Sequence, residues 1–228
     1  MVNTAGKRAM PRVRLPETAL AELRPYAGGS GAAGLGPDGD HDGVAFEGLD
    51  FAGADGAGSR FLECGLYDCG LDGTGLGRSR LIGTVLERVH GVGTDLSSGE
   101  LRDVELADAR LGGAALHGAR LTRVRVRGGK LDVPNFRQAV LKDVAFEGCV
   151  LVEPDFAGAT LERVSFEGCV LRGVRLEQAG LKDVDLRGAT ELGIASGAGR
   201  LSGAVISAAQ LMELAPVFAA ELGVRVSD

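Results

Sequence analysis

The side chains best suited to chemistry in this 228-residue chain are its four cysteines, its three histidines and a group of aspartates. Metal centres and disulfides both use cysteine, and the four residues are Cys64, Cys69, Cys149 and Cys169. Their spacing matches no zinc or redox motif, so a metal or disulfide role is the alternative to a role as small buried side chains. No histidine has a nucleophile at a spacing typical of a catalytic triad; the three are His41, His90 and His117. We expect no enzyme and no cofactor.

Three aspartates lie close together before the first strongly patterned stretch. Asp38, Asp40 and Asp42 begin like a calcium-binding EF-hand loop, but Leu49 stands where that loop needs a glutamate. No flanking helix is predicted either. A metal or small-molecule site at these aspartates is therefore only the third functional hypothesis, after the two that are given below.

A glycine-rich motif precedes the aspartates. Gly29, Gly31 and Gly34 fit the pattern G-x-G-x-x-G of dinucleotide sites. Such a site also needs a strand before the motif and a helix after it, and the sequence predicts neither. The stretch 27–43 is better explained as a flexible glycine-rich linker.

The composition limits the classes of partner. The chain has a net charge of −6 and a pI near 5.2, which argues against a general nucleic-acid binder. No run approaches the roughly 18 apolar residues that span a bilayer. No apolar segment follows the basic N-terminus, as it would in a signal peptide. We expect a soluble, cytoplasmic protein that binds neither nucleic acid nor membrane.

Large apolar residues recur at every fifth position from Phe46 to Leu186. Of these 29 positions, 19 hold Leu, seven hold Phe and one holds Val126, and the exceptions are Gly56 and Gly91. Neither a helix, with a period near 3.6, nor a strand, with a period of 2, explains this spacing. A square coil with five residues on each side does. A small or compact residue stands two positions before most of the central residues, and glycine is frequent two positions after them, where a corner must turn.

Some residues depart from this pattern. Gly56 and Gly91 predict gaps at the centre of the coil, and Gly91 also predicts a bulge or a soft joint. Pro134 and Pro154 occupy small positions that stack in adjacent coils, so we expect local weakening there.

Two segments show the repeating unit most clearly: Ala159-Thr-Leu161-Glu-Arg and Val184-Asp185-Leu186-Arg-Gly. In these units the chain resembles the pentapeptide-repeat family, whose consensus is A-(D/N)-L-x-x. The resemblance implies an all-β fold, a right-handed quadrilateral β-helix that buries one continuous core between stacked coils. We expect three regions: an N-terminal tail, short helix and linker at 1–43, the β-helix at 44–206, and a C-terminal helical cap at 207–228. The short helix is expected at 15–24, before Pro25.

The C-terminal segment has the signals of a helical cap. Ser207 is suited to the N-cap, Pro216 predicts a break into two short helices, and Gly223 predicts the end. Four residues are spaced as one apolar helical face: Leu211, Leu214, Phe218 and Leu222. We expect this face to cap the open end of the solenoid and to offer a contact for a homodimer.

Outward side chains fall on four walls when residues are counted in steps of twenty. One wall carries eight acids against four bases, and we take its acids as the candidate interaction surface: Glu47, Asp68, Glu87, Glu105, Asp108, Glu147, Glu167 and Asp185. Arg125 and Arg127 interrupt this wall, within a basic stretch from Arg120 to Lys130. The alternative is an ordinary solvated surface of mixed charge.

Two main functional hypotheses follow. The first is a non-enzymatic protein-interaction scaffold with an unknown protein partner, because no catalytic site emerges and the surface is regular. The alternative rests on the family resemblance: some members mimic DNA, bind DNA gyrase and protect it from quinolones. This chain is similar to them in its frame, its C-terminal segment and its acidic pI. Its modest charge departs from the dense, continuous negative charge that a DNA mimic should present.

Overall fold

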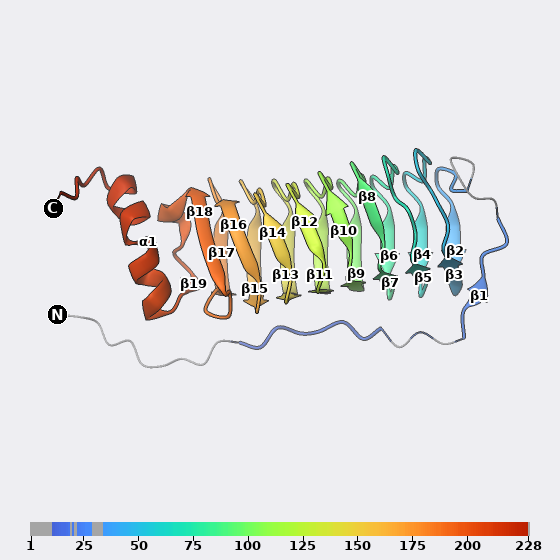
Figure 1. The fold of residues 1–228 in the computed structure, drawn as a ribbon. Coiled ribbons are helices and arrows are strands. Elements are labelled where there is room, and N and C mark those ends of the chain that lie inside the picture. The colour runs from blue at the N-terminus through green and yellow to red at the C-terminus, as the bar shows by residue number, and fades with distance from the viewer. Residues whose placement is uncertain (1–10, 19, 21, 29–33, 228) are drawn as a thin grey trace.

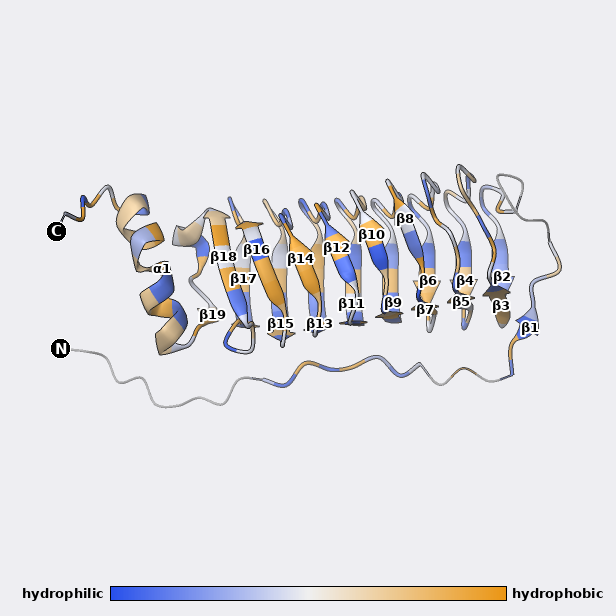
Figure 2. Cartoon of the chain, viewed as in Figure 1, coloured by the Kyte–Doolittle hydropathy of each residue, from blue (hydrophilic) through white to orange (hydrophobic). Residues whose placement is uncertain are grey.

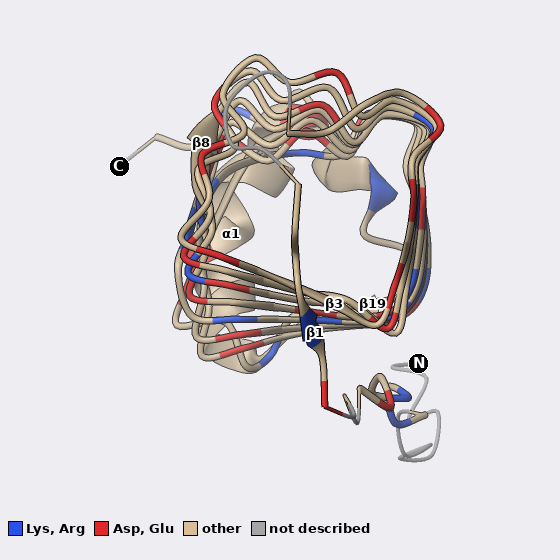
Figure 3. Ribbon diagram, turned by 90° about the vertical axis from the view of Figure 1, so that its right-hand side faces the viewer, with Lys and Arg blue, Asp and Glu red and all other residues tan. Residues whose placement is uncertain are grey.

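The computed structural model describes residues 11–18, 20, 22–28 and 34–227. The chain winds into a solenoid of about nine turns, and one helix closes its C-terminal end (Figure 1). A view along the solenoid shows its four-sided outline (Figure 3). The predicted all-β quadrilateral β-helix with a C-terminal helix is confirmed. Gly29 and Gly31 of the glycine-rich motif lie outside the described residues.

Parallel strands form the walls, and each residue pairs with the residue one coil later, as Leu121 does with Leu141. One sheet has the order β1-β3-β5-β7-β9-β11-β13-β15-β17-β19, with β2, β4 and β6 attached beside this path, and the other has the order β18-β16-β14-β12-β10-β8. No helix in the described part of the chain is long and apolar enough to cross a membrane. The elements are β1 (Arg24–Pro25), β2 (Asp40–Asp42), β3 (Val44–Glu47), β4 (Arg60–Leu62), β5 (Gly65–Tyr67), β6 (Arg80–Ile82), β7 (Val85–Glu87), β8 (His90–Val92), β9 (Glu100–Ala107), β10 (Arg110–Gly112), β11 (Arg120–Arg127), β12 (Lys130–Asp132), β13 (Val140–Glu147), β14 (Val150–Val152), β15 (Thr160–Glu167), β16 (Val170–Arg175), β17 (Gly180–Asp185), β18 (Glu191–Ser196), the 3-10 turn η2 (Ala198–Arg200), β19 (Ala204–Val205) and α1 (Ala208–Glu221).

The central residues of the repeat build the core. Because the pairing register repeats with each coil, like side chains lie above one another: Phe146 and Phe166 stack with ring centroids 4.9 Å apart. Phe136 and Phe156 stack at the same spacing. The middle coils have leucine in place of phenylalanine, and a cavity of about 40 Å³ with an apolar lining remains there. Hydrophobic and hydrophilic residues alternate along the strands around this core (Figure 2).

Every corner of the regular coils has a left-handed backbone. The residue two positions after each centre has a positive φ at every step from Asp38 to Asp183, whether or not it is glycine. Glycine adopts this conformation without strain, and Asp and Asn tolerate it better than most other residues. The residue least suited to this conformation is Val133, which is β-branched and has a φ of 49° and an exposed side chain.

Replacing Val133 with glycine is expected to stabilise the protein by about 1 kcal/mol, because the left-handed conformation is unfavourable for a β-branched side chain. The gain should appear as a higher urea midpoint of unfolding with an unchanged slope. The matched control is Val150→Gly, which removes the same side chain from a strand position of β14 with no positive φ. That change should destabilise, and a loss of stability in both variants would contradict the strain at the corner.

The two glycines at the centre of the coil do not act as predicted. Leu35 is buried and lies beside Gly56, where an added Cβ would come within 3.3 Å of the Leu35 Cβ, so Leu35 fills the expected gap. At Gly91 a Cβ would lie 2.6 Å from the carbonyl carbon of Leu71, so the neighbouring coil takes the space directly. Gly91 pairs in register with Leu111. The predicted gaps, and the bulge or soft joint at Gly91, are therefore wrong.

The stacked prolines leave the ladder continuous. The carbonyls of Pro134 and Pro154 accept hydrogen bonds from the N–H groups of Asp155 at 3.0 Å and Arg175 at 3.1 Å. Asn135 and Asp155 also form bridges to their neighbouring coils. The missing proline N–H groups do not interrupt the pairing on this wall.

The N-terminal region differs from the prediction. The described residues of 15–24 form no helix, and the segment runs in extended form beside the solenoid until β1 pairs with β3 (Figure 1). The described part of the expected linker belongs to the solenoid, since β2 pairs with β4 and His41 lies above Phe61. The backbone hydrogen bonds of an added coil compensate the entropy that a flexible linker would keep.

The C-terminal end also departs from the sequence prediction. One residue is inserted in the last coil, so Leu192 pairs with Leu171 and Glu191 is left exposed. Pro216 lies inside α1, which continues as a single helix, so the predicted break is wrong. Ser207 is the N-cap, as predicted, and forms a capping box with Gln210. Gly223 follows with φ of 68° and ends the helix as expected.

Candidate interaction surface

The outer surface is organised by ion pairs between successive coils. A residue and its neighbour one coil later are in contact, so an acid stacked on an arginine forms a direct pair. At one corner of the solenoid, four residues that lie above one another in successive coils alternate in charge and form a corner column: Asp103, Arg123, Asp143 and Arg163. Arg123 binds Asp103 through two hydrogen bonds of 2.5 Å, and Arg163 binds Asp143 at 2.7 and 2.9 Å. The Arg163 guanidinium holds the pKa of the nearly buried Asp143 below its usual value.

The extended N-terminal segment reaches the same corner column. The backbone N–H of Arg14 lies 3.5 Å from a carboxylate oxygen of Asp143, which leaves Asp143 only 3% exposed. The contact joins residues far apart in the sequence and places the segment along the outside of the coils (Figure 1).

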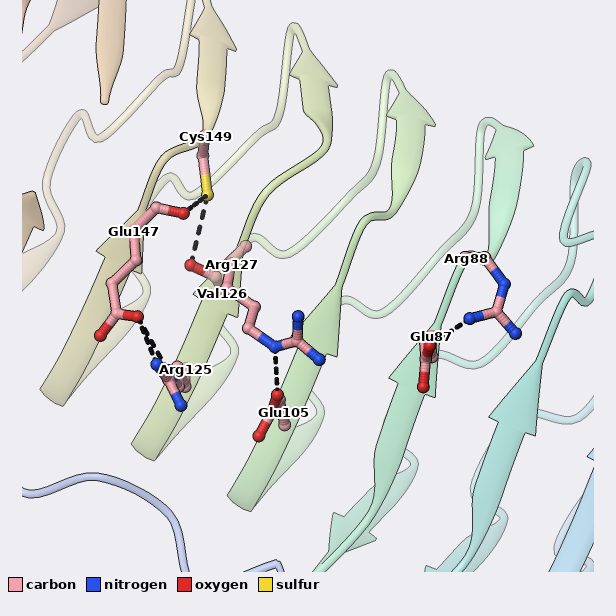
Figure 4. A network of polar contacts seen from close by, with 8 residues as sticks. All are labelled: Glu87, Arg88, Glu105, Arg125, Val126, Arg127, Glu147 and Cys149. Atoms are coloured by element: carbon pink, nitrogen blue, oxygen red, sulfur yellow. Dashed lines mark hydrogen bonds and ion pairs between the residues drawn. The ribbon is translucent and has the colours of Figure 1, made fainter. Parts of the chain in front are cut away.

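Arginines neutralise much of the wall that the sequence marks as acidic. Arg125 and Arg127 both extend from β11, in opposite directions (Figure 4). Arg125 binds Glu147 of β13 at 2.6 Å, and Arg127 binds Glu105 of β9 at 2.5 Å. The two arginines therefore link three adjacent strands, rather than separating two acidic halves.

The same pairing recurs toward both ends of that wall. Arg88 binds Asp68 with two bonds of 2.7 Å and also contacts Glu87. Arg187 binds Asp185 at 2.7 Å. These arginines lower the pKa values of Asp68 and Asp185. The three other predicted acids have no ion-pair partner in the described part of the chain: Glu47, Asp108 and Glu167.

The cysteines occupy the small inward position, as predicted, and all four are buried. Burial raises the pKa values of Cys64 and Cys69. Cys149 and Cys169 lie in adjacent coils, where the Cys149 N–H donates to the Cys169 sulfur at 3.4 Å. The contact with Cys169 and burial raise the pKa of Cys149, so this thiol is held neutral. Neutral buried thiols are poor nucleophiles and poor metal ligands.

The aspartates of the third hypothesis do not form a metal site. Asp40 and Asp42 lie on β2, and Asp40 binds Arg60 at 3.0 Å. The described residues contain no group of three His, Cys, Asp or Glu side chains placed to hold a metal ion.

His41 lies between these aspartates and belongs to an aromatic cluster. Its ring stacks on Phe61 with centroids 4.9 Å apart and meets Phe46 edge-on at 5.3 Å. Tyr26 covers the cluster. The buried Nε2 atom of His41 has no hydrogen-bond partner among the residues that the structure describes. Burial lowers the pKa of His41, because the apolar surroundings disfavour the charged ring.

Stability should therefore fall as the pH drops below the unfolded pKa of His41, near 6.5. The unfolded chain binds a proton there that the folded chain resists, and the loss should continue down to the lower folded pKa. The measurement is the urea midpoint between about pH 7 and 5. In His41→Phe the same curve should be flatter. A pH dependence identical to that of the wild type would show that His41 is not its source.

The predicted apolar face of the C-terminal helix is divided in two. Leu214 is buried and Phe218 is half-buried against the last coil, whereas Leu211 and Leu222 are 50% and 78% exposed. Met212, at 74% exposure, adds to the outward apolar surface. The sequence did not mark Gln210, which is buried and whose amide donates to the carbonyls of Leu186 and Ala189. Gln210 stands three residues after Ser207, the spacing of a capping box, and this spacing could have identified it from the sequence.

The five-residue frame of the structure matches a known family model. Residues 139–193 match the model described as the pentapeptide repeat region. The chain carries pentapeptide repeats. The pentapeptide repeats predicted from the sequence are therefore confirmed, and the five-residue repeat continues in the same register on the N-terminal side of the matched segment. No curated protein matches the chain.

Several solved structures are similar to the chain, including the following three, all with TM-scores below 0.5. A trypsin-treated variant of QnrB1, a plasmid-mediated fluoroquinolone resistance protein, is 18% identical, with 85% of this chain and 95% of that chain covered and a TM-score of 0.40. HetL, involved in heterocyst differentiation regulation in the cyanobacterium Nostoc sp. strain PCC 7120, is 19% identical, with coverages of 74% and 90% and a TM-score of 0.41. Rfr23 from the cyanobacterium Cyanothece 51142 is 19% identical, with coverages of 56% and 91% and a TM-score of 0.26.

Proposed function

We propose that this protein is a non-enzymatic scaffold whose outer walls bind another protein. The observation that carries the proposal is a surface whose charges are held in place by ion pairs between coils, such as Arg123 with Asp103 and Arg163 with Asp143. Side chains that are already fixed lose less conformational freedom on binding, so the wall is pre-organised for recognition.

A native pull-down from a lysate of the source organism tests the scaffold. We expect a partner protein that is retained at a constant ratio to the bait and is competed by the untagged chain. A chain that retains no partner under native conditions would contradict the proposal.

DNA mimicry with DNA gyrase as the partner is the alternative, and it has less support. A mimic needs dense, continuous negative charge. Five acids of the predicted wall pair with arginines: Asp68, Glu87, Glu105, Glu147 and Asp185. In a gyrase supercoiling assay with and without a quinolone, we expect neither inhibition nor protection at micromolar protein. Either effect would favour the mimic over an unrelated scaffold.

We further propose that α1 offers the contact for a homodimer. Leu211, Met212 and Leu222 are exposed apolar side chains on or beside this helix at the end of the rod. Light scattering of the purified protein should give twice the mass of one chain, and a monomer at all concentrations would contradict the contact.

A further inference from the structure

One wall of the solenoid is hollowed where side chains are missing. The hollow has a volume of about 800 Å³ and lies on β8, β10 and β12, which are neighbours in the second sheet. Three glycines are among the residues that line it: Gly91, Gly112 and Gly129. Gly112 and Gly129, which are partly exposed, contribute backbone to the lining of the hollow.

Three basic residues line one side of this hollow. His90, Arg110 and Lys130 are the first residues of β8, β10 and β12, and Arg110 pairs in register with both others. Neighbouring strands are about 4.8 Å apart, so the three side chains form a basic column along the rod. Like charges placed directly opposite one another are unfavourable.

Some other stacked arginines on the surface pair with acids. Arg60 and Arg80 also stack, but Asp40 binds the first and Glu100 lies 4.0 Å from the second. In the basic column, Lys130 binds Asp132 at 2.8 Å. Arg110 and His90 have no ion-pair partner within the described ranges. Arg110 is therefore a cation in the hollow without an ion-pair partner in the described chain, although Asp72 also lines the hollow.

The shape and the charge limit the class of ligand. Small-molecule sites usually enclose most of their ligand, and this hollow is broad and open. Nucleic-acid sites need many cations, and here Asp72 and Asp132 stand on the side opposite the basic column. Val92, which is 69% exposed, adds an apolar contact beside Gly112. A carboxylate next to an apolar side chain fits this combination.

We infer that the hollow binds an acidic segment of a protein partner, lying along the rod, with a carboxylate on Arg110 and an apolar side chain against Val92. This inference rests on the proposed scaffold function and names the part of the surface that does the binding. The ligand is extended across several coils, because the basic column crosses three of them.

Fluorescence anisotropy tests the inference on the full-length chain. The probe is a fluorescein-labelled peptide that alternates glutamate with leucine, and its control carries glutamine in place of glutamate. We expect saturable binding of the glutamate peptide and at least about tenfold weaker binding of the glutamine peptide. Absence of binding by the wild type, or equal affinity for both peptides, would overturn the inference.

Three variants locate the binding. Arg110→Glu should weaken binding of the glutamate peptide at least about tenfold. Gly112→Leu should do the same by filling the hollow, since a Cβ at this position meets Val92 only at 3.6 Å and the backbone is unstrained. Arg120→Glu is the matched control, with the same charge change at the first residue of β11 on another wall. An equal loss in Arg120→Glu would show a general charge effect and would overturn the site.

Two further outcomes separate the alternatives. Equal binding of a single-stranded oligonucleotide, lost in Arg110→Glu, would assign the hollow to phosphate and overturn the peptide. Retention of a partner in the pull-down by both Arg110→Glu and Gly112→Leu, at wild-type ratio, would keep the scaffold and reject this hollow as its binding site.

Discussion

Replacing Phe146 with alanine is expected to lower the free energy of unfolding by about 3–5 kcal/mol. Phe146 is fully buried, stacks on Phe166 at 4.9 Å and meets Phe136 edge-on at 6.4 Å. Because each coil of a solenoid contacts only its neighbours, the lost ring leaves a cavity that no distant residue can fill. Urea unfolding followed by circular dichroism measures the loss.

The matched control is Phe218→Ala, which removes the same ring from a half-buried position on α1. Its cost should be clearly smaller, because part of the ring is already in contact with water. Equal costs for the two variants would mean that the stacked ring column does not hold the coils together.

Replacing Leu214 with alanine is expected to cost about 2–5 kcal/mol and to expose the C-terminal end of the solenoid. Leu214 is 2% exposed and packs on the last coil, beside the Gln210 amide that donates to Leu186 at 2.8 Å and Ala189 at 3.2 Å. An uncovered end presents unpaired strand groups that favour association with other chains. Thermal unfolding should shift downward, and size-exclusion chromatography should show aggregates.

Leu211→Ala is the control for the cap, since it removes the same atoms from a side chain that is 50% exposed. Its effect on unfolding should stay within about 0.5 kcal/mol. If both leucines cost the same, α1 does not seal the end of the solenoid through its inner face.

The repeat could be predicted from sequence because one physical requirement acts at every fifth residue. A narrow interior accepts only a large central side chain and a small neighbour, so the register of Phe46, the cysteines and the corner positions follow from the spacing. At Glu191 the register fails, because one extra residue lets Leu192 take the buried position instead. The only sign of such an insertion in the sequence is that a polar residue, Glu191, stands where the repeat expects an apolar one.

The candidate surface was less predictable, for a related reason. A sum of charges over each wall gives the sign of the net charge of that wall, but it does not show which acid lies beside which arginine. Asp103, Arg123, Asp143 and Arg163 alternate at intervals of one coil, and this signal is present in the sequence. The links from Arg125 and Arg127 to acids on opposite neighbouring strands depend on side-chain direction, which the repeat does not fix. Pro216 likewise stays helical because Leu214 and Phe218 pack on either side of it.

The central claim is that this chain acts by binding a protein through its outer walls, and photocrosslinking in the source cells tests it most directly. A photoreactive amino acid is placed in turn at Val92 beside the hollow, and at three exposed positions on other faces: Arg102, Arg120 and Arg137. We expect one discrete crosslinked partner, formed from Val92 and abolished by Arg110→Glu. Equal or absent crosslinking from all four positions would contradict the account.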